Sequence, residues 1–166
     1  MHWAGRDIVI RPIRPEDETR HREFLARIEP EDIRMRFFQA RRELAHEELA
    51  RLTQIDYDRE MAFVAVGTDA QGRPETLGVV RVIGDPDNTE AEFAIMVRSD
   101  LKRLGLGSLL LERIVDYAKA RGTPKLVAHV LRENDAMLHL GVDGGFERQR
   151  TPLGDDVIKM VMDVAA

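Results

Sequence analysis

Two acidic side chains, Glu90 and Glu92, stand two residues apart in a segment, Thr89 to Val97, whose pattern predicts a β-strand. Because strand side chains alternate between the two faces of a sheet, both carboxylates point to one face and Phe93 to the other. A carboxylate held beside a substrate can accept a proton as a general base. A solvated strand face would carry the same residues, so the pair by itself leaves both interpretations open.

A basic, glycine-containing loop follows this strand and leads into an amphipathic helix expected over about Gly105 to Arg121. Backbone N–H groups in such a loop and at a helix N-terminus attract phosphate, and the flanking Arg98 adds positive charge. The third glycine of a dinucleotide-binding motif and the lysine of a P-loop are both missing. A plain strand–helix turn is the alternative interpretation. The candidate loop residues are Lys102, Arg103, Leu104, Gly105, Leu106, Gly107 and Ser108.

Thiolate and metal chemistry are disfavoured by composition. The chain has no cysteine, and its five histidines are scattered without metal-ligand spacing, so we expect no metal site. His129 lies within the apolar segment Lys125 to Leu131, and we predict a core or sheet-face histidine rather than a catalytic group. Asn134 precedes a short helical stretch and is by composition a good N-cap.

The whole chain is expected to fold as one domain, residues 1–166. A net charge of −5 argues against general nucleic-acid binding. The sequence contains neither an apolar run long enough for a membrane span nor a signal-peptide core, so we expect no membrane partner and a cytoplasmic location. Composition leaves the oligomeric state open.

Hydrophobic periodicity predicts an α/β fold with a mixed, mostly antiparallel sheet of about seven strands flanked by helices. Met1 to Gly5 is expected to be a tail. The expected strands are 7–13, 61–66, 77–83, 89–97, 125–131, one opened by 144–147, and 156–164, and the expected helices begin near 15, 30, 46, 105 and 134.

The loop Lys102 to Gly107 fits the pattern (Q/R/K)-x-x-G-x-(G/A), and downstream Asn134 is followed at matching intervals by Met137, Leu140 and Gly145-Phe146. In both motifs the chain resembles the GNAT family of N-acetyltransferases. Three longer segments are similar to the acetyltransferase domain of the Pat-type bacterial protein-lysine acetyltransferases. These segments are 11–17, 52–62 and 97–102.

The resemblance implies a GNAT fold with acetyl-CoA as cosubstrate and no metal. It places the cofactor pyrophosphate at the Lys102 to Ser108 loop. It also implies that the strand carrying Glu92 bulges and splays away from the strand Lys125 to Leu131, with the pantetheine arm in the gap. The backbones of Ile95, Met96 and Val97 would then bind that arm or polarise the thioester carbonyl.

Catalysis in the family implies a general base at Glu92 in a partly apolar setting, acting directly or through a relay. Glu90 would be a helper or a contact for substrate charge, Tyr57 a substrate-loop residue, and Asn134 a contact to the pantetheine arm or the reaction centre. Many relatives have a tyrosine as general acid seven residues after the asparagine. This chain has Gly141 there, which leaves the acid unassigned.

The expected activity is transfer of an acetyl or short acyl group from acetyl-CoA to the ε-amine of a lysine on a protein, such as an acyl-CoA synthetase. Two alternatives stay open. One is acetylation of a small amine. The other is a non-catalytic module that senses acyl-CoA.

Overall fold

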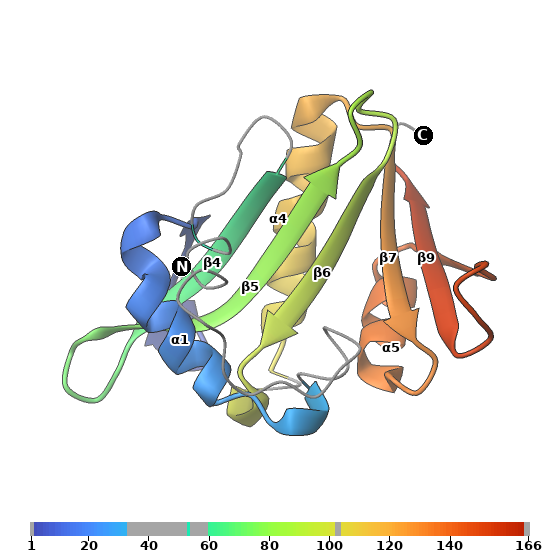
Figure 1. Cartoon of the computed structure of the whole chain (residues 1–166). Coiled ribbons are helices and arrows are strands. Elements are labelled where there is room, and N and C mark those ends of the chain that lie inside the picture. The colour runs from blue at the N-terminus through green and yellow to red at the C-terminus, as the bar shows by residue number, and fades with distance from the viewer. Residues whose placement is uncertain (1, 33–52, 54–59, 102–103, 165–166) are drawn as a thin grey trace.

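A seven-stranded sheet with the order β3-β4-β5-β6-β7-β9-β8 organises the protein (Figure 1). The computed structural model describes residues 2–32, 53, 60–101 and 104–164. The strands of this sheet are β3 (Val9–Pro12), β4 (Glu60–Thr68), β5 (Pro74–Gly84), β6 (Ala91–Val97), β7 (Lys125–Leu131), β8 (Glu147–Gln149) and β9 (Val157–Asp163). A separate two-stranded sheet pairs β1 (His2–Trp3) with β2 (Arg6–Asp7). The helices are η1 (Pro15–Asp17), α1 (Glu18–Ala26), η2 (Ser99–Leu101), α4 (Leu106–Arg121) and α5 (Asp135–Asp143).

The predicted fold class is confirmed. Neighbouring strands of the main sheet run antiparallel except β6 and β7, which are parallel. β3 lies at one edge of the sheet, as its Pro12 indicated, because proline cannot donate a ladder hydrogen bond. β4 and β5 form the expected hairpin.

Helices cover both faces of the sheet, with α1 in front and α4 behind in Figure 1. The larger core cluster contains the α4 side chains Leu110 and Ile114, both fully buried, against Phe93 and the alternate residues of β7. The smaller cluster packs Phe24 of α1 against the opposite face. α4 ends at Arg121 and is capped by Gly122, whose positive φ of 72° is a helix-terminating conformation that suits glycine.

The prediction of an N-terminal tail is wrong. Trp3 is buried, and its indole Nε1 donates a hydrogen bond to the backbone carbonyl of Leu104 at 2.9 Å. On β2, the Arg6 guanidinium donates a hydrogen bond to Oε1 of Glu75 on β5 at 2.6 Å. The first residues of the sequence show no periodic pattern that would reveal this packing, because the partners of Trp3 and Arg6, Leu104 and Glu75, lie far along the chain.

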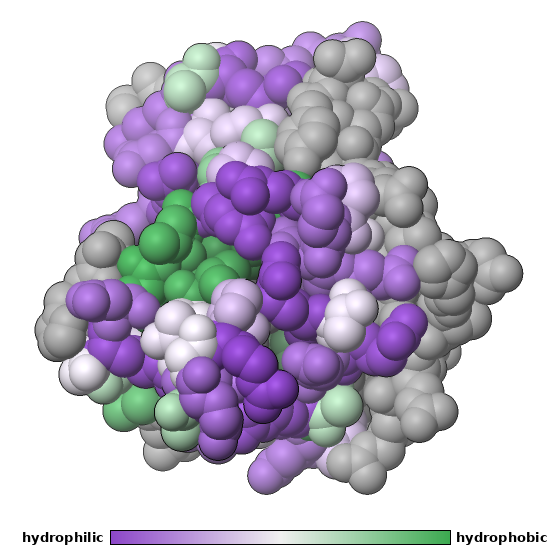
Figure 2. Space-filling view, turned by 90° about the vertical axis from the view of Figure 1, so that its left-hand side faces the viewer, coloured by the Kyte–Doolittle hydropathy of each residue, from purple (hydrophilic) through white to green (hydrophobic). Residues whose placement is uncertain are grey.

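Pro30 to Asp32 are helical as predicted, whereas the rest of that predicted helix and the one at 46–52 lie outside the described residues. Among the residues that are described, no helix is long and apolar enough to cross a membrane. Figure 2 shows the side that faces left in Figure 1, a mostly hydrophilic surface with one compact apolar patch.

Candidate active site

A cleft opens in the sheet between β6 and β7. These strands pair only at their start, where Ala91 aligns with Leu126 and Glu92 with Val127. Beyond that point they diverge, as the family resemblance implied, and leave a cavity of about 680 Å³. The strands of a sheet otherwise exclude anything from between them, so this gap is where an extended ligand can lie along a strand edge.

The bulge expected in the strand of Glu92 is absent. β6 pairs with β5 in one unbroken register from Gly84↔Ala91 to Gly78↔Val97. A bulge leaves one residue of the bulged strand without a partner, whereas each of the seven residues of β6 pairs with a residue of β5. A register shift lies instead between β4 and β5, where Ala65 pairs with Gly78 and Val66 with Thr76, so that Leu77 of β5 is passed over.

The direction of the backbone groups on β6 follows from this register. Arg98 N donates to Leu77 O at 2.9 Å, and Asp85 N donates to Glu90 O at 2.9 Å, so the even-numbered residues turn their polar backbone groups to β5. In an antiparallel ladder the odd-numbered residues must then turn away from β5. Ile95 and Val97 therefore direct N–H and C=O toward the cleft, whereas the backbone groups of Met96 are turned to β5.

The opposite wall of the cleft follows the same rule. Arg132 N donates to Asp156 O at 2.8 Å, which continues the β7–β9 ladder at even-numbered residues of β7. His129 and Leu131 consequently direct their backbone groups toward β6. The cleft is thus bordered on both sides by strand edges whose peptide groups face inward.

One end of the cleft is formed by the start of α4, where Gly105, Leu106, Gly107 and Ser108 line it. Gly105 has a φ of 92°, a conformation that suits glycine, and it places the first turn of α4 against the cavity. A Cβ at Gly107 would stand 3.2 Å from a methyl group of Leu140, so a side chain there would crowd the site. A helix N-terminus carries partial positive charge and unpaired N–H groups, which suits a phosphate.

Of the other residues predicted for this loop, the structure describes only Leu104. Leu104 is 51% exposed, and its backbone carbonyl accepts the hydrogen bond from Trp3. Lys102, Arg103 and Tyr57 lie outside the described residues, so their roles stay predictions.

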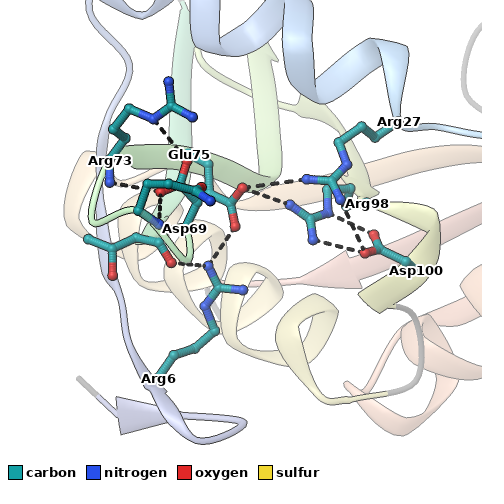
Figure 3. Close-up of polar contacts among 9 residues, drawn as sticks. Arg6, Arg27, Asp69, Arg73, Glu75, Arg98 and Asp100 are labelled. Carbon is teal, nitrogen blue, oxygen red and sulfur yellow. Dashed lines mark hydrogen bonds and ion pairs between the residues drawn. The ribbon is translucent and has the colours of Figure 1, made fainter.

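Arg98 does not serve as a phosphate contact, contrary to our expectation. Its buried guanidinium donates two hydrogen bonds to Asp100, at 2.7 and 2.8 Å, and lies 3.2 Å from Glu75 (Figure 3). The hydrogen bond to Asp100 raises the pKa of the Arg98 guanidinium against the opposing effect of burial. Glu75 also forms ion pairs with Arg6 of β2 and with Arg27, which follows α1. This cluster ties η2, which precedes the glycine loop, to the body of the sheet.

Glu92 contacts His129, which the sequence led us to predict as a core or sheet-face histidine rather than a catalytic group. Its Oε1 lies 2.5 Å from Nδ1 of His129. The Glu92 side chain is 58% exposed, so the partly apolar setting expected for it is wrong. No local signal in the sequence pointed to His129: it stands two residues beyond Val127 on the same face of the sheet, and only the observed register places Val127 beside Glu92.

Glu90 shares this side of the sheet with a cation. Its Oε1 lies 3.9 Å from Nζ of Lys159 on β9, and Lys159 is the register partner of His129. An acidic and a basic side chain therefore flank the Glu92–His129 pair. The structure thus brings Glu90, Glu92 and His129 together, as the alternation of strand residues requires.

Asn134 and Gly141 lie on α5. Asn134 caps the helix, because its Oδ1 accepts a hydrogen bond from Met137 N at 3.2 Å, and it also lines the cleft. Both roles considered for it are therefore sterically compatible. Gly141 is buried, and a Cβ there would stand 2.6 Å from the terminal methyl of Met160. Position 141 of α5 thus faces the core, and the space beside Met160 has no room for a tyrosine side chain.

Comparisons with known proteins identify the class. The Acetyltransferase (GNAT) family model matches residues 27–141. An acetyltransferase of Pseudomonas aeruginosa is 31% identical over 169 residues, which cover 99% of this chain and 89% of the relative. The chain therefore belongs to the GNAT family of acetyltransferases.

Solved structures agree with this fold. The GNAT domain of S. lividans PAT has a TM-score of 0.84 and 27% sequence identity, with 96% of this chain and 92% of that chain covered. Spermidine N-acetyltransferase from Vibrio cholerae, in complex with CoA and spermine, has a TM-score of 0.76 at 22% identity, with 95% and 96% covered. The latter likeness shows the fold alone.

GNAT acetyltransferases use acetyl-CoA as cosubstrate, and a solved relative contains it. The residues present fit that molecule. The inward-facing peptide groups of Ile95 and Val97 suit the amides of a pantetheine arm, and the N-terminal turn of α4 suits a pyrophosphate. Within the described part of the chain, no group of three or more histidine or acidic residues is placed to hold a metal ion.

Proposed function

We propose that this chain acetylates the ε-amine of lysine residues on a protein, such as an acyl-CoA synthetase. Two findings support the proposal. The Pat-type segments of the sequence agree with the fold similarity to the GNAT domain of S. lividans PAT. Glu92 and Glu90 are also accessible on the sheet face beside the cleft, with side-chain exposures of 58% and 44%. Exposed carboxylates at this place attract a cationic side chain presented on a protein surface.

The proposed chemistry depends on one observation, the accessible carboxylate of Glu92 beside the cleft. Less than roughly one lysine in a thousand is neutral near pH 7, so transfer to an amine needs a nearby proton acceptor. We propose that Glu92 supplies this basic site, directly or through a relay. Acetyl-CoA supplies the acetyl group as a thioester. The N–H groups of Ile95 and Val97 are the candidates to polarise its carbonyl. A thiol has a pKa of about 8.5, so the leaving thiolate needs no tyrosine at Gly141.

A competition experiment tests the proposed acceptor. The protein is incubated with acetyl-CoA and a mixture of a folded acyl-CoA synthetase, free lysine and spermidine, while thiol release and the mass of each acceptor are followed. We expect the synthetase to gain acetyl groups at lysine Nε, at rates that exceed those of the free amines by an order of magnitude. Peptide mass spectrometry locates the modified lysines.

The opposite preference would contradict the protein-lysine proposal. If spermidine or free lysine is consumed faster than any protein lysine, the acceptor is a small amine. If acetyl-CoA binds in calorimetry but no acceptor gains mass and no thiol is released, the chain is a binding module. Heat-denatured synthetase serves as the control, because it presents the same lysines without a folded surface.

A further inference from the structure

His129 contacts the exposed carboxylate of Glu92 and also borders the cleft. His129 is one of the residues that line the cavity, and its side chain is 23% exposed. Glu92, by contrast, does not line the cavity, although its Oε1 is 2.5 Å from His129 Nδ1. Of these two residues, His129 is therefore the one that borders the place where a thioester would lie.

The contact with Glu92 decides which nitrogen of the imidazole carries the proton. An ionised carboxylate can only accept hydrogen bonds, so Nδ1 of His129 must be the donor. In the neutral imidazole the lone pair is then on Nε2, at the opposite side of the ring. A histidine oriented by a carboxylate in this way is the arrangement that activates nucleophiles in many enzymes.

Charged groups around the ring support this arrangement. Lys159, the register partner of His129 on β9, lies 3.9 Å from Glu90, so its positive charge is compensated by that carboxylate. The Glu92 carboxylate compensates the imidazolium that forms when Nε2 takes a proton. The carboxylate of Glu92 is thus the charged group in direct contact with the ring.

We propose that Nε2 of His129 is the immediate acceptor of the amine proton and that Glu92 orients the ring and stabilises its charged form. This inference rests on the proposed acetyl transfer to an amine and names the relay within it. The amine lone pair forms the C–N bond to the thioester carbon, the C–S bond pair leaves with the thiolate, and the amine proton moves to Nε2. The proton subsequently passes to solvent.

The tautomer of His129 provides a test that does not depend on which amine is acetylated. Long-range ¹H–¹⁵N NMR spectra of the imidazoles distinguish a proton on Nδ1 from one on Nε2. In the wild-type chain at neutral pH we expect the proton of His129 on Nδ1. In Glu92→Ala we expect the ring to lose this preference. A wild-type ring with its proton on Nε2 would overturn the proposal.

Kinetics with the preferred amine separate the two candidate bases. Glutamine at position 129 can still donate an N–H to Glu92 but cannot accept a proton. We expect His129→Gln to lower kcat by about a hundredfold or more, the usual contribution of a general base, while calorimetry shows acetyl-CoA affinity within a few-fold of wild type. Added imidazole should restore activity to His129→Ala, because it can occupy the vacated space.

The activity of the double variant, compared with those of the single variants, decides whether His129 or Glu92 is the direct base. If His129 and Glu92 act as a unit, His129→Gln combined with Glu92→Ala loses little more than His129→Gln alone. If Glu92 is the direct base, His129→Gln stays within threefold of wild type and the double variant loses as much as Glu92→Ala; that result refutes our inference. A wild-type chain that acetylates no amine would refute the proposed function, and the tautomer measurement would still decide the state of the ring.

Discussion

The carboxylate of Asp17, at the start of α1, shows how a single residue stabilises this fold. It is fully buried and accepts hydrogen bonds from the guanidinium groups of Arg11, at 2.7 and 2.8 Å, and of Arg20, at 2.5 Å. Arg14 N donates a further bond at 2.8 Å. Burial alone would raise the pKa of Asp17, but the hydrogen bonds from Arg11, Arg20 and Arg14 outweigh it and hold the pKa far below its usual range.

Asp17→Asn should therefore destabilise the protein. We expect a loss of roughly 3 kcal/mol in the free energy of unfolding, because two guanidinium groups keep their positions but lose the compensating charge. Urea unfolding at pH 7 measures it. Asp116→Asn, the same chemical change at an exposed site of α4, is the control and should stay within about 0.5 kcal/mol. Equal effects of the two substitutions would contradict the argument.

The same residue predicts acid sensitivity. The pKa of Asp17 is lower in the folded than in the unfolded chain, where it is about 3.9, so the unfolded chain takes up the proton first as the pH falls. Its contribution is complete above about pH 5 and is lost as the pH falls below about 4 toward the folded pKa. The stability difference between wild type and Asp17→Asn should therefore shrink between about pH 5 and pH 3. A difference that grows in this interval would contradict it.

Which residues could be predicted depended on whether their partners are close in sequence. Glu92 and Asn134 carry their signal locally, in strand alternation and in a helix start. His129 sits in an apolar strand, and only the alignment of β6 with β7 brings it to Glu92. Arg98 looked basic and available beside the loop, but its charge is used within the fold by Asp100 and Glu75.

Among the elements, the short strands β1 and β2 make an unexpected contribution to the glycine loop. The indole N–H of Trp3 donates to Leu104 O, inside that loop, while Arg6 reaches Glu75, which in turn contacts Arg98. The N-terminal pair of strands therefore holds the loop at two points, one at Leu104 and one next to η2. Elements that look like a terminal extension thus fix the proposed phosphate site.

Trp3→Phe tests this connection, because it removes the N–H and keeps most of the ring. One lost hydrogen bond of about 1 kcal/mol corresponds to about a fivefold weaker acetyl-CoA affinity by calorimetry, with kcat changed less than about twofold. Tyr117→Phe, which removes a polar aromatic group on α4, is the control. An unchanged affinity in Trp3→Phe would show that the contact does not position the loop. Trp3 is the only tryptophan, so its fluorescence also reports ligand binding in the wild-type chain.

The elements themselves were largely predictable, because local periodicity and caps specify them. The central helix, expected from about Gly105, begins at Leu106 and ends at Arg121 as predicted. The expected bulge in β6 was an implication of the family alone, and no local residue pattern supported it. Pairing with β5 decides such details, since an extra residue needs a partner strand that leaves it out.

For the molecule as a whole, the opening of the sheet between β6 and β7 predicts a pattern of amide exchange. Ile95 and Val97 direct their N–H groups to the cleft, whereas Ala94 and Met96 direct theirs to β5. NMR hydrogen exchange should show strong protection of Ala94 and Met96 at all times. Ile95 and Val97 should gain protection only when acetyl-CoA is added.

An adenosine bisphosphate without the pantetheine arm is the matched control for this measurement. It should protect amides at the start of α4, such as Gly107 and Ser108, and leave Ile95 and Val97 as they are in the free protein. Protection of Ile95 and Val97 by this fragment, or equal protection along β6 without ligand, would contradict a pantetheine site between the strands.

The sequence by itself determined the fold class, the order along the chain of the strands in the main sheet, the glycine loop and the face to which Glu92 points, because periodicity, turns and caps are local properties. Only the tertiary structure decided that β6 and β7 separate after Glu92, that Trp3 packs on Leu104, and that His129 meets Glu92. Each of these depends on strand register and packing between segments distant in the chain. No local pattern encodes such pairings, since many registers satisfy the same alternation of residues.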